Sequence, residues 1–332
     1  MKVLFIGGTG LISTAVSKLA VAKNIDLYLL NRGKRQSTPI LGTHLLQADI
    51  YQVDEVKEVI RDHFFDVVVE WIAFTVDHVK RDYELFKGKT NQYIFIGTAS
   101  SYQKPAPFLP ITEDVPRDNP YWEYSQNKRD CENYLKAIHD PDFHVTIIRP
   151  SHTYDDHSLI FQLTTYSHPY SLLHRMINQQ PIVLVGDGSS HWTLTHHEDF
   201  AYAFIDILGN HHAYDQDYHL TSDKVYTWNE ITSLMYNALD MKPNIIYLPY
   251  EHIKKHFPEM EGMLMGDNMH DTIFDNSKIK KVAPHYRSLI ELKDRIPKMI
   301  AYYQNNESLM QIDESFLKRY DEMIRDYQGK KT

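Results

Sequence analysis

The chain has 332 residues, 42% hydrophobic and 24% charged, which is enough apolar bulk for one large or two modest domains. A net charge of −9 argues against nucleic acid as a partner. The single cysteine, Cys131, excludes an internal disulfide framework and indicates a reducing, cytoplasmic location. Neither a run of about 18 apolar residues nor a cysteine–histidine spacing is present, so we expect no membrane span and no metal site.

The N-terminal residues predict a strand, a glycine turn and a helix. Residues 3–6 are apolar, Gly7 to Gly10 break the run, and apolar residues recur at helical spacing from Leu11. Such a turn presents backbone N–H groups at a helix N-terminus and can hold a pyrophosphate. The spacing fits both GxGxxG and GxxGxxG, with Ser13 in place of the last glycine, and a plain structural turn is the alternative.

Strands and helices alternate over the rest of the first 150 residues. Strands are expected at 25–30, 44–48, 65–73, 92–96 and 144–148. Helices are expected at 53–63, 76–86 and 121–138. This rhythm predicts βαβ units, and therefore a doubly wound parallel α/β sheet of the Rossmann type over residues 1–150.

The regular rhythm ends near residue 150. Helices are expected at 171–178, 198–208, 228–239, 289–303 and 315–327, and strands at 182–185, 218–220 and 245–248. Residues 151–332 therefore predict a smaller, mixed α/β substrate domain. We expect the segment at about 190–225 to return to the large sheet.

The end of the second strand bears on the choice of dinucleotide. In this fold an acidic residue there bonds the ribose 2′-hydroxyl, whereas an arginine accommodates a 2′-phosphate. The segment from Asn31 to Lys34 has Arg32 and no acid, which favours NADP(H) over NAD(H). A solvated turn is the alternative interpretation.

Three residues suggest acid–base chemistry. Tyr124 and Lys128 are four apart on a predicted helix and share one face. An ammonium beside a phenol favours the phenolate, which can accept a proton from a hydroxyl. Thr98 follows the fifth strand, at the sheet edge where such folds bind ligands, and its hydroxyl could hold a substrate oxygen.

Taken together, these motifs resemble a known family. Gly7 to Gly10, Thr98 to Tyr102, the Tyr124–Lys128 pair and Arg149 to Tyr154 follow one another as in the extended short-chain dehydrogenase/reductases, the NAD-dependent epimerase/dehydratase family. Residues 192–199 and 274–278 are similar to its atypical branch, near the chloroplast stem-loop-binding proteins.

The resemblance implies a catalytic triad of Thr98, Tyr124 and Lys128, and hydride transfer between a sugar carbon and the nicotinamide. It implies epimerase, dehydratase or reductase chemistry on a sugar or nucleotide-sugar-like hydroxyl compound. It also implies a homodimer formed through helices 76–86 and 121–138. The cofactor would be held by Gly7, Thr9, Gly10, Leu11, Ile12, Asn31, Arg32, Asp49, Ile50, Ile72, Ala73, Pro150, Ser151 and His152.

One departure from the family concerns the substrate. Many nucleotide-sugar members carry an arginine that meets a diphosphate near the position of Trp192. This puts a UDP- or dTDP-sugar in doubt, unless Arg175, His174 or His191 substitutes for it. Trp192 itself would pack the small domain or stack on a sugar face, and packing is the favoured reading.

Two further functions stay open. The first is an RNA-binding or nuclease-like protein on the same scaffold, as similarity to the stem-loop-binding branch allows. The second is a cofactor-sensing regulator without turnover.

Overall fold

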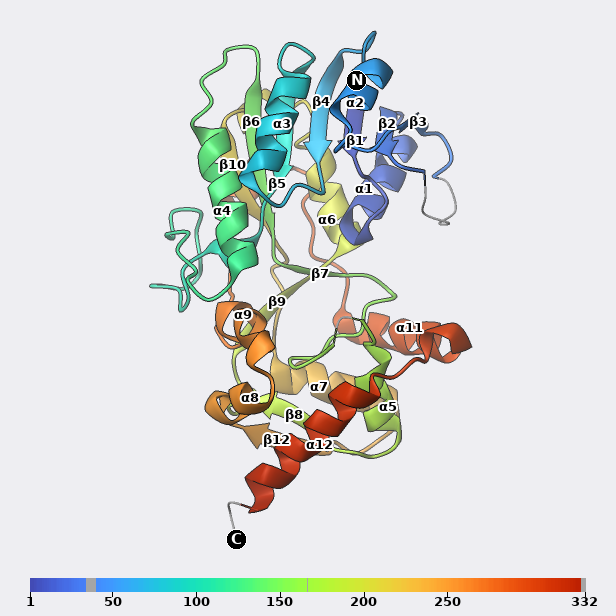
Figure 1. The fold of residues 1–332 in the computed structure, drawn as a ribbon, viewed down its shortest axis with the longest axis vertical. Coiled ribbons are helices and arrows are strands. Elements are labelled where there is room, and N and C mark those ends of the chain that lie inside the picture. Colours follow the sequence, from blue (N-terminus) through green and yellow to red (C-terminus); the bar gives the residue numbers. More distant parts are fainter. Residues whose placement is uncertain (34–39, 166, 330–332) are drawn as a thin grey trace.

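The computed structural model describes residues 1–33, 40–165 and 167–329, and it confirms the predicted doubly wound α/β sheet. Seven parallel strands lie in the order β10-β6-β5-β4-β1-β2-β3 (Figure 1). Their bounds are β1 (Lys2–Ile6), β2 (Asp26–Asn31), β3 (His44–Gln47), β4 (Phe65–Glu70), β5 (Thr90–Ile96), β6 (His144–Pro150) and β10 (Gln216–Leu220). Strand order reverses between β1 and β4, which is where this fold opens a ligand crevice.

Helices cover both faces of the sheet because its strands are apolar on both sides. Val3 and Phe5 of β1 pack with α1 (Leu11–Ala22) and α6 (His197–Ile205) on one face. Leu4 and Ile6 point to the other face, where the helices are α2 (Val53–Val59), α3 (Val76–Phe86) and α4 (Glu123–Lys136). Two packed layers of helix on one sheet therefore hold the upper part of the molecule together.

Strand β4 and helix α2 both end earlier than the sequence predicts. Strand β4 stops at Glu70, whose carboxylate accepts a hydrogen bond from the Ile72 backbone and turns the chain toward the cleft. Helix α2 stops at Val59 because the Lys89 ammonium binds the carbonyls that follow it, those of Ile60, Arg61 and His63. Both ends were predicted three to four residues later.

The lower part of the molecule has its own hydrophobic core. Its helices are α5 (Tyr170–Ile177), α7 (Trp228–Ala238), α8 (Tyr250–His256), α11 (Leu292–Gln304) and α12 (Glu314–Gly329). They pack around a parallel pair of strands, β8 (Ile182–Val185) and β12 (Ile245–Leu248).

Short helical segments occur along the whole chain, at Ala99–Ser101, His211–Ala213, Pro258–Met260, Glu261–Met263, Leu264–Asn268, Ser277–Lys280 and Glu307–Leu309.

A small sheet joins the two parts. It pairs β7 (His152–Tyr154) with β9 (His191–His196), and β9 with β11 (Val225–Thr227). The chain then returns to the upper part, where α6 packs on α1 and β10 extends the large sheet beside β6. The sequence analysis did not predict these three strands. Strands β7 and β11 have only three residues each, too few to show a period of two.

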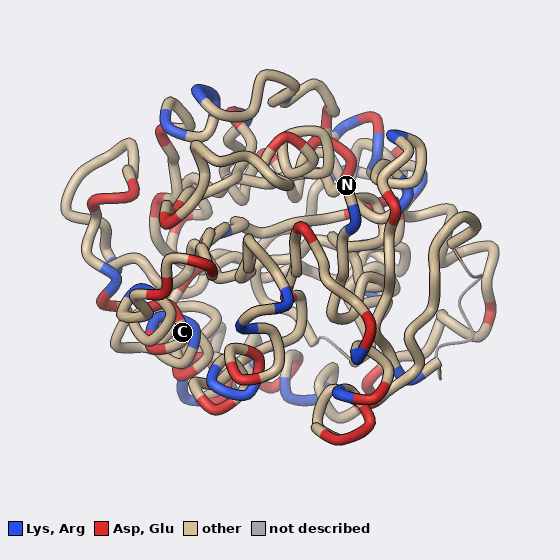
Figure 2. Tube along the Cα trace, turned by 90° about the horizontal axis from the view of Figure 1, so that it is seen from above, with Lys and Arg blue, Asp and Glu red and all other residues tan. Residues whose placement is uncertain are grey.

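Charges and membrane-spanning potential add little to this picture. Figure 2 shows acidic and basic residues interspersed along the described chain rather than gathered on one side. Among the described residues, no helix has the length and apolar content needed to cross a membrane.

Candidate functional site

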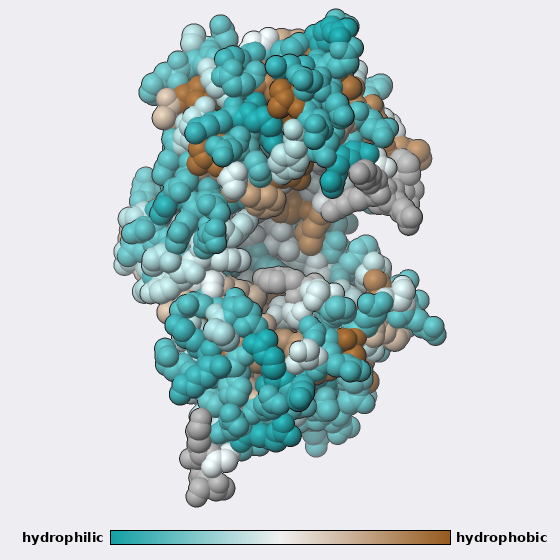
Figure 3. All heavy atoms as spheres, in the orientation of Figure 1, coloured by the Kyte–Doolittle hydropathy of each residue, from teal (hydrophilic) through white to brown (hydrophobic). Residues whose placement is uncertain are grey.

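A cavity of about 570 Å³ opens at the carboxyl ends of the sheet strands. It lies at the switch in strand order, and Figure 3 shows the molecule hollowed between its upper and lower parts. Most of the predicted cofactor residues line this cavity: Gly7, Thr9, Gly10, Leu11, Ile12, Asn31, Arg32, Asp49, Ile50, Ile72 and Pro150. Tertiary structure thus brings together residues that the sequence separates by more than a hundred positions.

The glycine turn is shaped as a cradle for a phosphate group. Gly7 and Gly8 have φ angles of +101° and +85°, and residues with a side chain rarely adopt such positive φ values. A Cβ on Gly8 would lie 2.6 Å from Leu29 Cδ2. The Gly10 N–H donates to Ser13 Oγ at 2.8 Å, so the serine that replaces the family's third glycine caps the start of α1.

The adenosine end of the cavity is formed by turns after β2 and β3. Asn31 Oδ1 accepts the Gly33 N–H at 2.9 Å, and Asp49 Oδ1 accepts the Tyr51 N–H at 3.2 Å. Arg32 lies between these turns on the exposed rim. Lys34 lies outside the described residues.

Three of the predicted cofactor residues occupy other places. Ala73 is buried, and its carbonyl accepts a hydrogen bond from Lys128. Ser151 and His152 line a second, smaller cavity next to the first. Pro150 lines both cavities and marks their junction.

Lys128 lies under the cofactor cavity and is 2% exposed. Its Nζ donates to the carbonyls of Ala73 and Ile96, at 2.6 and 2.8 Å. Burial lowers the pKa of Lys128 to about 8, and nearby Glu70 opposes that shift. The ammonium is therefore fixed by the backbone at the ends of β4 and β5.

Tyr124 lies one turn before Lys128 and lines both cavities. Burial raises its pKa, and an interaction with the Thr98 hydroxyl partly offsets that rise. The Lys128 ammonium donates its hydrogen bonds to backbone carbonyls instead of the Tyr124 phenol. This geometry does not support the expectation that Lys128 favours the phenolate form of Tyr124. The phenol holds its proton at neutral pH and is available as an acid.

Thr98 starts a chain of buried hydroxyl groups that the sequence did not predict. Thr98 Oγ1 lies 2.9 Å from Ser100 Oγ, which lies 2.7 Å from Ser125 Oγ on α4. Each hydroxyl can donate to one neighbour and accept from another. These hydroxyl groups connect the end of β5 to α4, the helix that carries Tyr124.

The second cavity, of about 290 Å³, combines aromatic rings with polar groups. Thr98 and Tyr124 lie on one side and Trp192 on another. Trp192 packs between the rings of His152 and Trp228, with centroids 4.3 Å from each, so packing is indeed one of its roles. Burial lowers the pKa of His152 to about 4, which leaves that ring neutral.

The cations expected to replace the missing arginine are elsewhere. Arg175 is buried in the lower core, where Nη1 bonds Asp321 at 2.7 Å and the guanidinium lies over the Tyr320 ring. His174 is its neighbour on the same helix, α5, and lines neither cavity. His191 lies 3.0 Å from Asp271 and lines a third cavity. The suggestion that Arg175 or His174 substitutes for the arginine is therefore wrong.

The sequence also missed Trp122, Asp267 and Phe274 in the small cavity. Asp267 belongs to the π-helical turn Leu264–Asn268, far from Tyr124 in the sequence. A Cβ on Gly262 or Gly266 would lie within 2.6 or 2.9 Å of Trp122. These two glycines, four residues apart, were the available sequence signal for a close contact at this point.

Two buried acids lie near the cavity, Glu70 at the end of β4 and Asp82 on α3. Burial and Asp82 raise the pKa of Glu70 well above its ordinary value, and burial also raises the pKa of Asp82. Tyr93 donates to Asp82 at 2.8 Å, and Arg81 pairs with the same carboxylate. The loss of water and the neighbouring Asp82 charge both disfavour the ionised form of Glu70.

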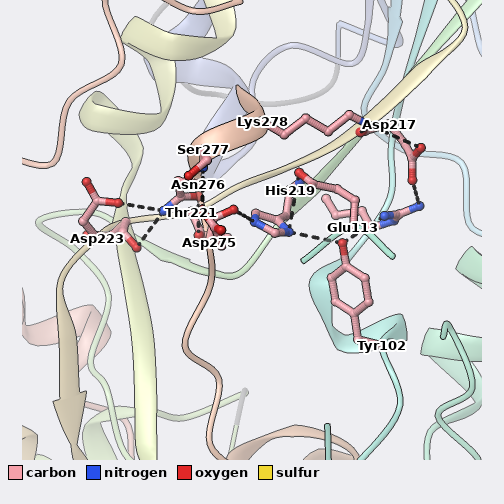
Figure 4. A network of polar contacts seen from close by, with 12 residues as sticks. Tyr102, Glu113, Asp217, His219, Thr221, Asp223, Asp275, Asn276, Ser277 and Lys278 are labelled. Carbon is pink, nitrogen blue, oxygen red and sulfur yellow. Dashed lines mark hydrogen bonds and ion pairs between the residues drawn. The ribbon is translucent and has the colours of Figure 1, made fainter. Parts of the chain in front are cut away.

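A second buried network lies beside the site, at the edge where β10 joins the sheet. Figure 4 shows Tyr102 and Glu113 beside His219. The Arg149 guanidinium bonds both the Tyr102 hydroxyl and the Asp217 carboxylate. His219 Nε2 lies 2.8 Å from the Asp275 carbonyl, and Nδ1 lies 3.2 Å from the Tyr102 hydroxyl. The network joins the sheet to the segment at residues 275–278.

The sequence of this chain is similar to those of known proteins. A model of the NAD dependent epimerase/dehydratase family matches residues 3–220. The chain is 26% identical over 278 residues to the chloroplast stem-loop binding protein of 41 kDa b from Arabidopsis thaliana, covering 77% of this chain and 69% of that protein. These matches confirm the resemblance drawn from the motifs.

Solved structures show the same fold at low identity. An epimerase from Methanothermobacter thermautotrophicus is similar with a TM-score of 0.74 at 14% identity, over 93% of this chain and 94% of that one. The UDP-glucose 4-epimerase of Bifidobacterium longum, solved with NAD⁺ and UDP, gives 0.70 at 16% over 92% and 99%. The UDP-glucuronic acid 4-epimerase of Bacillus cereus, solved with UDP-glucuronic acid and NAD, gives 0.70 at 17% over 92% and 99%.

Proposed function

Because this chain belongs to the NAD dependent epimerase/dehydratase family, a family of NAD-dependent enzymes, we propose that it acts on a sugar-like hydroxyl compound with Tyr124 as its acid–base group. The observation that supports this most directly is the position of Tyr124, whose side chain lines the large cavity and the small one. A group placed there reaches a dinucleotide on one side and a substrate on the other.

The residues present fit a nicotinamide dinucleotide. The Gly7–Gly10 turn is a cradle that a Cβ would fill, and the start of α1 adds helix N–H groups for a pyrophosphate. Such a cofactor supplies hydride acceptance and donation when bound. We propose residues 1–150 as the cofactor-binding domain and residues 151–332 as the substrate domain, which sends β10 back to the large sheet.

The proposed roles of the triad follow from their surroundings. Tyr124 holds a proton on its phenol at neutral pH and can pass it to a substrate oxygen, or take one after ionisation. Thr98 can donate to the same oxygen, with Ser100 and Ser125 fixing its orientation. Lys128, held by Ala73 and Ile96, faces the cofactor cavity and can bond a ribose hydroxyl.

We further propose that the cofactor is NADP(H) in preference to NAD(H). Support comes from Arg32, which lines the adenosine end where an acid would otherwise bond the 2′-hydroxyl. Asp49 also lines this end, but its carboxylate is bound to the Tyr51 backbone. Isothermal titration with each dinucleotide measures this preference directly.

The decisive test of the proposed function uses that titration and a turnover assay together. We expect at least one dinucleotide to bind, and Tyr124→Phe to bind it equally well while losing turnover. If neither dinucleotide binds at millimolar concentration, the proposal fails. Binding without any hydride transfer in wild type would instead support a cofactor-sensing regulator.

A second candidate function is RNA binding, and the similarity to the chloroplast stem-loop binding protein is the observation that favours it. The net charge of −9 and the interspersed surface charges weigh against it. A gel shift with a structured RNA discriminates between the two, because phosphate-backbone binding weakens steeply with salt.

We also propose a homodimer formed through α3 and α4, which lie side by side. Their outer face carries charged residues, among them Asp77, Lys80, Glu84 and Asp130. An interface of this kind would weaken at high salt. Sedimentation at low and high salt measures both the oligomeric state and this dependence.

A further inference from the structure

The small cavity beside Tyr124 has a distinctive charge pattern. Asp267 is a carboxylate on its wall, and no lysine or arginine is found among the described residues that line it. His152, which also lines it, is neutral because burial holds its pKa at about 4. The wall that meets a substrate is therefore negative or neutral throughout the part that the structure describes.

Asp267 is built into this wall by buried neighbours. Its side chain is 18% exposed, and its Oδ1 lies 3.6 Å from the Nζ of Lys104, which is 1% exposed. The Trp192 indole also bonds the carboxylate. Burial raises the pKa of Asp267 and lowers that of Lys104, and the attraction between the two groups opposes both shifts. The 3.6 Å contact with Lys104 holds the Asp267 carboxyl group in place beside the cavity.

Asp267 and Tyr124 are close enough for their charges to interact. The carboxylate of Asp267 contributes to the raised pKa of the Tyr124 phenol, and both side chains line the same cavity. A substrate whose hydroxyl meets Tyr124 can therefore also meet Asp267 in the same cavity. Carboxylate oxygens accept hydrogen bonds and donate none, so they select hydroxyl groups.

A nucleotide diphosphate does not fit these surroundings. The third cavity, formed by residues next in sequence to Trp192 and Asp267, is lined by Asp187 and Asp271, again without a lysine or arginine among its described residues. Arg175 is committed to Asp321 in the lower core. A diphosphate in either cavity would lie near these acidic side chains, and the described lining residues include no lysine or arginine to pair with it. The nearby Lys104 ammonium is already paired with Asp267, and burying an unpaired charge is costly.

The remaining walls suit the carbon skeleton of a sugar. Trp122 and Phe274 line the cavity and offer apolar surface for the C–H faces of a ring. Its volume of about 290 Å³ is at the small end of ligand sites, which span about 300–1,000 Å³. A single unphosphorylated sugar matches that size, apolar surface and hydroxyl-accepting wall.

We propose that the substrate is an unphosphorylated sugar, and that Asp267 is a specificity residue that binds its hydroxyl groups in the cavity that Tyr124 also lines. This rests on the proposed function, since it assumes that the small cavity receives the compound on which Tyr124 acts. The carboxylate sets the choice by accepting hydroxyl groups and repelling phosphate.

The test uses the full chain loaded with its dinucleotide. Glucose, galactose, mannose, xylose and arabinose are compared with UDP-glucose, UDP-glucuronic acid and dTDP-glucose, by thermal shift and by absorbance at 340 nm. We expect one or more free sugars to stabilise the loaded protein and to be turned over, and UDP at millimolar concentration not to compete with them.

Asp267→Asn then tests the assigned residue. Loss of a charged hydrogen bond should raise KM for the free sugar by about tenfold to a hundredfold, with cofactor affinity unchanged. Because this variant strands the Lys104 ammonium, the double variant Lys104→Met/Asp267→Asn is measured beside it and should show the same rise. Asp271→Asn, a matched acid in the third cavity, should leave KM unchanged.

The possible results separate the two proposals. Failure to bind either dinucleotide overturns the proposed function itself. A loaded protein that turns over UDP-glucose or dTDP-glucose, or that responds to none of the free sugars, overturns this inference and leaves the proposed function standing. An unchanged KM in both Asp267 variants overturns the role of Asp267.

Discussion

The Arg149 guanidinium donates three hydrogen bonds to the Glu132 carboxylate, at 3.1, 3.0 and 2.7 Å, and both side chains are fully buried. Arg149 lies on β6, directly before Pro150 at the junction of the cavities, and Glu132 lies one turn after Lys128 on α4. A Cβ on Gly97 would lie 2.5 Å from Glu132 Oε1, so the glycine after β5 makes room for this pair. The ion pair thus fixes α4, the helix that carries Tyr124 and Lys128, against the sheet.

Breaking this pair should destabilise the fold strongly. Glu132→Ala leaves the buried Arg149 charge with less compensation, and we expect a loss of about 3–5 kcal/mol in the free energy of unfolding. Urea denaturation measures it. Asp130→Ala on the same helix removes a partly exposed pair with Arg129 and should cost less than about 1 kcal/mol. Equal costs for the two variants would contradict this account.

Tyr124→Phe should reduce turnover by about 10²–10⁴-fold, because proton transfer is lost while the ring still fills its place. Cofactor affinity should stay within a few fold. Because burial raises the pKa of Tyr124, the oxidative rate of wild type should rise with pH as the phenol ionises. The half-exposed Tyr121 provides the control, and Tyr121→Phe should keep full turnover. Steady-state kinetics with paired titrations show whether the loss is confined to Tyr124.

Arg32→Ala should weaken NADP⁺ binding by about tenfold to a hundredfold, the value of a charged hydrogen bond, and leave NAD⁺ binding nearly unchanged. Isothermal titration with both dinucleotides gives the two ratios. Arg61→Ala removes an exposed cation that pairs with Glu58 on α2 and should change neither affinity. If Arg32→Ala weakens both dinucleotides equally, Arg32 does not read the 2′-phosphate.

Glu70→Gln should be tolerated, because burial and the neighbouring Asp82 raise the pKa of Glu70 and favour its neutral form, which the amide resembles in size. A raised carboxyl pKa makes the folded state bind more protons than the unfolded state, so wild type loses stability as pH rises above the ordinary range of glutamate. Glu70→Gln removes this dependence and should gain stability relative to wild type at higher pH. Glu70→Ala leaves the Ile72 N–H and Asp82 short of a partner and should cost about 1–3 kcal/mol. Urea denaturation of the three proteins across pH tests this order.

Three buried histidines should make the fold sensitive to acid. Burial lowers the pKa values of His152, His196 and His219 to about 4. Between that value and an unfolded pKa near 6.5, the unfolded chain binds more protons, so stability falls as pH drops through this window. Urea denaturation between pH 7 and pH 4 measures the slope, and His219→Gln should make it shallower. The exposed ring of His157 provides the control, since His157→Gln should leave the slope unchanged.

The sequence by itself determined the upper half of the molecule. Short β-branched and aromatic runs such as 65–70 and 92–96 favour buried strands, and Val76–Phe86 is a helix at the predicted bounds. The glycine turn and the Tyr124–Lys128 spacing are local, because each depends on residues that are near neighbours in the chain. Local patterns of this kind identified the family, the sheet and most residues of the cofactor cavity.

Only the tertiary structure decided what surrounds Tyr124. Asp267, Trp122 and Trp192 come from three distant segments and meet at one cavity, and no periodicity in the sequence relates them. The direction of the Lys128 ammonium, toward Ala73 and Ile96, depends on where β4 and β5 end. Long-range packing places these groups and sets the charges of the small cavity, which is why the nature of the substrate could be addressed only from the fold.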